Sequence, residues 1–88
     1  MKEIWILGVY VKNRAATINR IQPVLTKFGC VIKTRLGLHN FDDTEERDPG
    51  SGLILLELTG DEKEFIKLEN ELMLLEEVSV RKMVFPGF

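Results

Sequence analysis

Two segments of this chain, Ile4–Val11 and Leu53–Leu58, are apolar at nearly every position, which constrains the fold more than any other feature of the sequence. A strand with apolar residues on both faces lies inside a sheet and is covered on both sides. Two other segments, Val31–His39 and Val78–Phe85, carry charged residues among the apolar ones. We therefore predict two central strands and two edge strands.

Two stretches of helical period separate these strands, so the order of elements is strand, helix, strand, strand, helix, strand. This βαββαβ order is typical of the ferredoxin-like sandwich, an α+β fold with two layers. The 88 residues suffice for one domain, and we expect residues 1–88 to form it. Because this fold hosts many functions, the function has to be argued from particular sites.

The first predicted helix runs from Arg14 to Phe28, after Asn13, whose side chain suits the N-cap position. Pro23 lies inside this stretch, and we expect a kink or a break there because proline lacks the amide hydrogen and clashes with the preceding turn. One apolar stripe at helical spacing predicts the buried face, and it consists of Ile18, Ile21, Leu25 and Phe28.

The second predicted helix runs from Glu62 to Glu76. Asp61 is placed to cap its first turn, and Glu64 completes a capping box. On the outer surface Lys67 is spaced to pair with Glu71. The inward stripe is predicted to consist of Phe65, Leu68, Leu72 and Leu75.

In a two-layer fold the helices cover one side of the sheet and leave the other side open. The arrangement that we adopt places five apolar side chains on the open side, namely Trp5, Leu7, Val9, Leu53 and Leu55. The reverse arrangement of the first strand exposes Ile4, Ile6 and Tyr10 instead. Either way an apolar patch remains, and such patches usually mark association. We therefore expect a homodimer or tetramer formed through the open sheet face.

Charge and cysteine content narrow the classes of partner. The formal net charge is −2, with 12 basic and 14 acidic residues, so no broad basic field is available to a phosphate backbone and we expect no direct nucleic-acid binding. The one cysteine, Cys30, has no disulfide partner or metal motif, and we expect it to be buried. No apolar run reaches the length of a membrane span and no signal-peptide pattern is present, so we expect a cytoplasmic protein without membrane contact.

The turn between the first strand and the first helix is the best small-molecule candidate. Lys12, Asn13 and Arg14 combine two cations with the free amides of a helix N-terminus, which together favour an anion. The simpler interpretation is a capped helix start with solvated charges, and we favour it over the anion site.

The single histidine, His39, ends the second predicted strand, Val31–His39, beside an acidic stretch that contains Asp42, Asp43 and Glu45. A metal site is one interpretation, although one imidazole with flexible carboxylates binds transition metals poorly. Lys33 and Arg35 are predicted to share a face of this strand with His39. They either contact a partner's acidic groups or a phosphate, or simply keep an edge strand soluble.

Residue sets for catalysis are missing from the sequence. One histidine leaves no plausible Ser/His/Asp or Cys/His arrangement. The first strand is followed neither by a CxxC motif nor by a glycine-rich loop, and the third strand carries no aromatic residue for stacking on RNA. We therefore expect a protein that is not an enzyme and holds no cofactor.

With these elements in place, nearly the whole chain resembles the short stand-alone ACT-like domains known as iron-only hydrogenase system regulators. The resemblance is carried by Gly8–Arg14, Phe28-Gly29, Arg35–Gly37 and Val78–Val80. It implies an antiparallel sheet of order 4-1-3-2, assembly into dimers or tetramers, and a regulatory role. Such a module would bind a small molecule between subunits or dock on a partner protein.

A more distant resemblance is to the regulatory domain of nickel-responsive repressors, which binds metal through several histidines and a cysteine. Here the corresponding strand offers only His39, and Cys30 lies at its other end. The alternative function that this resemblance implies is a nickel- or zinc-responsive module using His39.

Overall fold

The computed structural model describes residues 3–12, 14–39 and 51–87, without the side chains of residues 14–16 and 39. None of the helices in these residues is long and apolar enough to span a membrane. The elements follow the predicted order: β1 (Ile4–Val11), α1 (Arg14–Lys27), a short 3₁₀ helix (Gly29–Val31), β2 (Ile32–His39), β3 (Gly52–Leu58), α2 (Glu62–Met73) and β4 (Val78–Phe85).

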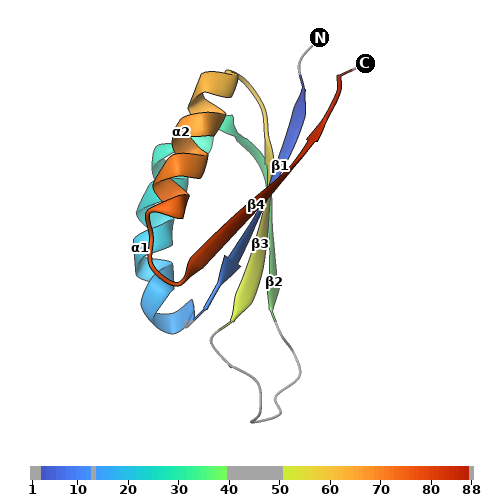
Figure 1. The fold of residues 1–88 in the computed structure, drawn as a ribbon. Helices are drawn as coiled ribbons and strands as arrows, with labels where there is room; N and C mark the ends of the chain where they lie inside the picture. Colours follow the sequence, from blue (N-terminus) through green and yellow to red (C-terminus); the bar gives the residue numbers. More distant parts are fainter. Residues whose placement is uncertain (1–2, 13, 40–50, 88) are drawn as a thin grey trace.

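The four strands form one antiparallel sheet in the order β2-β3-β1-β4, and both helices pack on the same side of it (Figure 1). This is the layout of the ferredoxin-like α+β fold, and it confirms the expected sheet order. The two strands with the most continuous apolar sequence, β1 and β3, are the central ones, as predicted.

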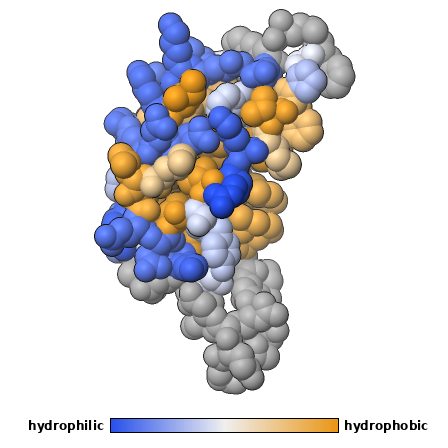
Figure 2. All heavy atoms as spheres, viewed as in Figure 1, coloured by the Kyte–Doolittle hydropathy of each residue, from blue (hydrophilic) through white to orange (hydrophobic). Residues whose placement is uncertain are grey.

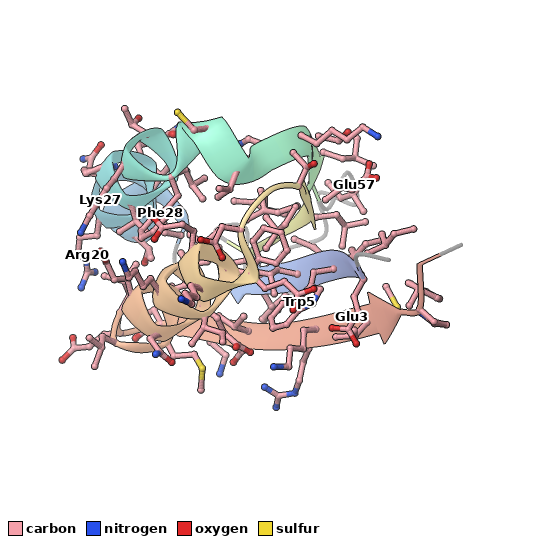
Figure 3. All side chains as sticks on the ribbon, turned by 90° about the horizontal axis from the view of Figure 1, so that it is seen from above. Glu3, Trp5, Arg20, Lys27, Phe28 and Glu57 are labelled. Atoms are coloured by element: carbon pink, nitrogen blue, oxygen red, sulfur yellow. The ribbon has the colours of Figure 1, made fainter. Side chains whose placement is uncertain are left out.

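The core lies between the helices and one face of the sheet. β1 turns Trp5, Leu7, Val9 and Val11 toward the helices, and Trp5, the most exposed of them, is only 6% exposed. The Trp5 ring lies 5.4 Å from the ring of Phe65 on α2, and its Nε1 donates to the Glu3 carboxylate at 3.3 Å (Figure 3). These bulky side chains therefore form the layer that the helices cover.

α1 contributes Ile21 and Leu25 to the core, and Phe28 follows them directly after the helix. Thr17 is also fully buried, and its hydroxyl donates to the Lys12 carbonyl at 3.0 Å. The helix continues through Pro23 to Lys27, so the break allowed for in the prediction is absent. Pro23 is an exposed residue, and so is Asn19, whose carbonyl loses its amide partner.

α2 begins as predicted at the Asp61 N-cap, whose carboxylate accepts a hydrogen bond from the Lys63 amide at 2.9 Å. It ends at Met73, earlier than the predicted Glu76, and the chain then turns through Glu77, which has a φ of 66°. The predicted inward stripe is confirmed, with Leu75 partly buried after the helix and three members fully buried: Phe65, Leu68 and Leu72.

The surface ion pairs of α2 differ from the prediction. Lys67 donates to Glu64 at 2.9 Å rather than to Glu71, and this hydrogen bond raises the pKa of Lys67. Glu71 accepts instead from Lys27 on α1 at 2.7 Å. The Lys27 ammonium also lies 5.4 Å from the centre of the Phe28 ring (Figure 3). A tertiary contact between the helices therefore replaces the expected local pair.

A register shift interrupts β2 between Ile32 and Thr34. Ile32 pairs with Leu58 whereas Thr34 pairs with Glu57, so Lys33 is the extra residue of a bulge. In a regular strand Ile32 and Thr34 would lie on the same face. Because of this shift Ile32 instead packs against the core, on the opposite side of the sheet from Thr34.

Candidate functional site

The side of the sheet that points away from the helices is largely apolar, and we call it the open face. Residues directly opposite each other in a ladder share a face, so the strand registers identify its members. Its apolar side chains are Ile4, Ile6, Tyr10, Leu36, Leu38, Leu53, Leu55, Met83 and Phe85. In Figure 2 hydrophobic atoms gather along the margin of the molecule that lies across the sheet from the helices.

The apolar residues of the open face form continuous rows across the strands. One row consists of Leu38, Leu53 and Tyr10. In the next row Leu36 lies beside Leu55, and Leu55 lies beside Gly8. Leu36 is 50% exposed and Tyr10 41%, so much of this surface loses contact with water only when another molecule covers it.

Two residues of opposite charge lie on the open face, Glu57 on the central strand β3 and Arg81 on the edge strand β4. Glu57 on β3 accepts a hydrogen bond from the Thr34 hydroxyl at 3.1 Å and lies 3.8 Å from the Lys33 ammonium. Arg81 on β4 donates to the Val80 carbonyl at 2.9 Å, and within the described residues it lies in no ion pair. Apart from Glu57, the described residues that the two central strands turn to this face are apolar or Gly8.

The predicted interface residues divide between the two sides of the sheet. Trp5, Leu7 and Val9 are buried beneath the helices and are not on the open face. Leu53 and Leu55 are on the open face, because they pair with Tyr10 and Gly8, the β1 positions that alternate with the buried ones. The reverse arrangement considered from the sequence, with Ile4, Ile6 and Tyr10 on the open side, is the observed one.

The predicted ligand turn is only partly described. Lys12 is exposed, and its backbone amide donates to the Glu77 carbonyl at 2.9 Å. Its own carbonyl accepts from the buried Thr17 hydroxyl. Asn13 and the side chain of Arg14 lie outside the described residues, so the anion site at this turn stays a prediction.

The remaining candidate residues from the sequence, Lys33, Arg35 and Cys30, do not come together in one site. Lys33 contacts Glu57, whereas Arg35 lies on the helix side of β2 and donates to Gln22 at 3.1 Å. Cys30 is exposed in the 3₁₀ helix, so the expectation that it is buried is wrong. The neighbouring Phe28 occupies the core position at this end of α1 instead.

The predicted metal site falls mostly outside the described residues, since it combines the His39 side chain with carboxylates of the segment 40–50. Across residues 3–12, 14–39 and 51–87 the structure brings together no group of three or more His, Cys, Asp or Glu side chains suited to a metal. The nickel or zinc alternative therefore stays a prediction.

Sequence reasoning missed a hollow of about 280 Å³ between α1 and the β2–β3 side of the sheet. Ile18 and Gln22 border it from α1, and Ile54 and Arg35 border it from the strands. It also touches Gly37 and Gly52. The sequence signal for this hollow is the pair of glycines, Gly37 near the end of β2 and Gly52 at the start of β3.

Comparisons with known proteins show the fold alone. No protein-family model matches the sequence, and no curated protein matches it. Among solved structures the chain is similar to the uncharacterized protein TM1266 from Thermotoga maritima, with a TM-score of 0.80 and 21% sequence identity. The match covers 97% of this chain and 100% of that one, so the two proteins share the whole fold.

Proposed function

We propose that this protein is a non-catalytic, ACT-like regulatory domain that acts as a homo-oligomer, with the open face as the contact between copies. The observation that carries the proposal is an apolar surface that extends over all four strands. Strands of 7 or 8 residues spaced ~4.8 Å apart give a face of roughly 500 Å² in all, of which the apolar side chains cover the larger part. Monomeric proteins rarely expose contiguous apolar patches larger than a few hundred Å².

A second copy of the chain suits the open face better than an unrelated molecule. The face carries one acidic group, Glu57, and one unpaired basic group, Arg81, on different strands of the described sheet. Because a two-fold contact brings the same surface against itself, the Glu57 of one copy could approach the Arg81 of the other, although Lys33 already lies 3.8 Å from Glu57. Most of the other described side chains of the face are apolar, as in the buried core of a protein interface.

Regulation would follow from the assembly equilibrium. A ligand or partner protein that binds one assembly state better than another shifts the equilibrium by its differential affinity. The resemblance to hydrogenase-system regulators and the ferredoxin-like layout support this role. We also propose a cytoplasmic location, where the exposed Cys30 would stay reduced.

The test is the mass of the purified protein by light scattering at increasing concentration. The native chain should form a dimer or tetramer. Leu55→Arg places a cation in the middle of the open face and should give a monomer, since each copy would bury an unpaired charge. Leu55 lies outside the core between helices and sheet, so circular dichroism should show an intact fold.

Ile66→Arg is the matched control. Ile66 is 48% exposed on α2, on the other side of the molecule, so this variant should keep the native mass. A native chain that stays monomeric at ~100 μM, far above the Kd of a stable homodimer, would refute assembly. A native mass in Leu55→Arg would show that the copies meet through another surface.

A further inference from the structure

We propose that the hollow between α1 and the β2–β3 side of the sheet binds a small aliphatic monocarboxylate, with Arg35 holding the carboxylate and the apolar walls holding the chain. The hollow has a volume of about 280 Å³ and is bordered by residues of a single protomer. Binding there goes beyond the proposed assembly, because it does not require a second copy.

The space exists because Gly37 has no side chain at a position that faces α1. Gly37 pairs with Ile54, whose side chain is buried in the core, so a side chain at position 37 would point the same way. A Cβ built on Gly37 would meet nothing within 4 Å. Ile18 and Gln22 border the same space from α1. The hollow is therefore a gap between layers with room for additional atoms.

Arg35 supplies the recognition group. Its Nη1 donates to the Gln22 Oε1 at 3.1 Å, which holds the guanidinium beside the hollow. A guanidinium has five N–H donors, so donors remain after this bond. Within the described residues no carboxylate lies at ion-pair distance from Arg35. Arginine binds carboxylates through two parallel hydrogen bonds, and this makes a planar monoanion the fitting partner.

The remaining walls define the rest of the ligand. Ile18 and Ile54 offer apolar contact, and no Asp or Glu borders the hollow among the described residues. An ammonium group on the ligand would therefore lose water without gaining a partner. Small-molecule sites begin at about 300 Å³, so the hollow suits a chain of a few carbon atoms. A short unaminated carboxylate satisfies all three conditions.

The experiment is an NMR titration of the native protein with hexanoate, followed through the backbone amides. Saturable shifts are expected at Gly37 and Gly52, which border the hollow, but not at Gly29 or Gly60. We expect a Kd of about 1 mM or lower. Hexanamide, which lacks the charge, and 2-aminohexanoate, which adds an ammonium group, should each bind at least tenfold more weakly.

Two variants and one control locate the site. Arg35→Gln should weaken hexanoate binding at least tenfold, whereas Arg20→Gln removes a cation of α1 that faces Glu76 and should change the Kd less than twofold. Gly37→Val fills the hollow with a residue that strands favour and should abolish saturable binding. A dispersed spectrum for each variant verifies its fold.

The outcomes separate this proposal from the proposed assembly. Leu55→Arg should bind hexanoate within twofold of the native Kd, whatever its mass, because Leu55 does not border the hollow. No saturable shift in the native protein, or equal binding of hexanamide, would overturn the carboxylate site and leave the assembly claim untouched. Tighter binding of 2-aminohexanoate would overturn the ligand class.

Discussion

Two neighbouring residues of β3 provide the sharpest test of how the sheet divides its two faces. Leu56 is fully buried in the core, whereas Leu55 is on the open face. Leu56→Ala should therefore destabilise the fold itself, by about 3 kcal/mol within the ~2.7–5 kcal/mol range of buried Leu→Ala changes. For 88 residues the total stability is about 4–13 kcal/mol, so this loss is a large fraction of it.

Leu55→Ala should behave differently, because Leu55 is only partly buried on the open face, where we propose that copies of the protein meet. At a concentration where the protein is monomeric, the expected cost is within ~0.5 kcal/mol, as for other surface changes. At higher concentration the native chain gains stability from association, by about 1.4 kcal/mol for each tenfold step in a dimer. Leu55→Ala should lose part of this gain, while Leu56→Ala keeps its concentration dependence.

Thermal and urea unfolding at two protein concentrations measure both effects. A loss of about 3 kcal/mol lowers the melting temperature of a domain this small by roughly 12–24 °C. Equal destabilisation by the two substitutions in the monomer would refute the assignment of faces. A stability of the native chain that does not depend on concentration would refute the role of the open face in assembly.

Three further predictions follow from single contacts. The only tryptophan, Trp5, is buried among core residues, so its fluorescence should stay blue-shifted in Leu55→Arg, and a red shift on loss of assembly would place it on the open face instead. Asp61→Ala removes the acceptor of the Lys63 amide and should cost about 1 kcal/mol by urea unfolding, with Asp61→Asn restoring most of it. Because Glu64 raises the pKa of Lys67, Glu64→Gln should lower that pKa in an NMR titration. The stability that the Lys67–Glu64 pair contributes is complete at neutral pH, and it is lost as the pH rises through the raised pKa of Lys67.

Much of the fold is readable from the sequence because local patterns agree with it. The alternation of apolar segments with stretches of helical period predicts the order of elements. The continuous apolar character of β1 and β3 identifies them as the central strands. The Asp61 cap and the inward stripe of α2 rest on spacing within one helix and are confirmed. These features depend on neighbours in the chain, so the sequence contains the information needed to predict them.

Features that depend on contacts between distant segments are the ones that the sequence leaves open. Both sides of β1 are apolar, so periodicity does not decide which side the helices cover. Glu57 indicates the open side of β1, because it pairs with Ile6 in the neighbouring strand. That pairing register depends on contacts between distant segments, so the sequence pattern does not predict it. The bulge at Lys33 and the pairing of Lys27 with Glu71 are of the same kind.

The central strands connect the stability of the fold with its assembly. In β3, Leu56 faces the helices and Leu55 faces outward. The same strand therefore contributes apolar side chains to both faces of the sheet. A chain this short buries a modest share of its surface on folding, and an uncovered sheet face leaves part of the available apolar burial unused. Association through that face would add burial without adding residues. The hollow beside Gly37 lies on the helix side of the same sheet, so substitutions at Arg35 and at Leu55 would test the proposed ligand binding and the proposed assembly separately.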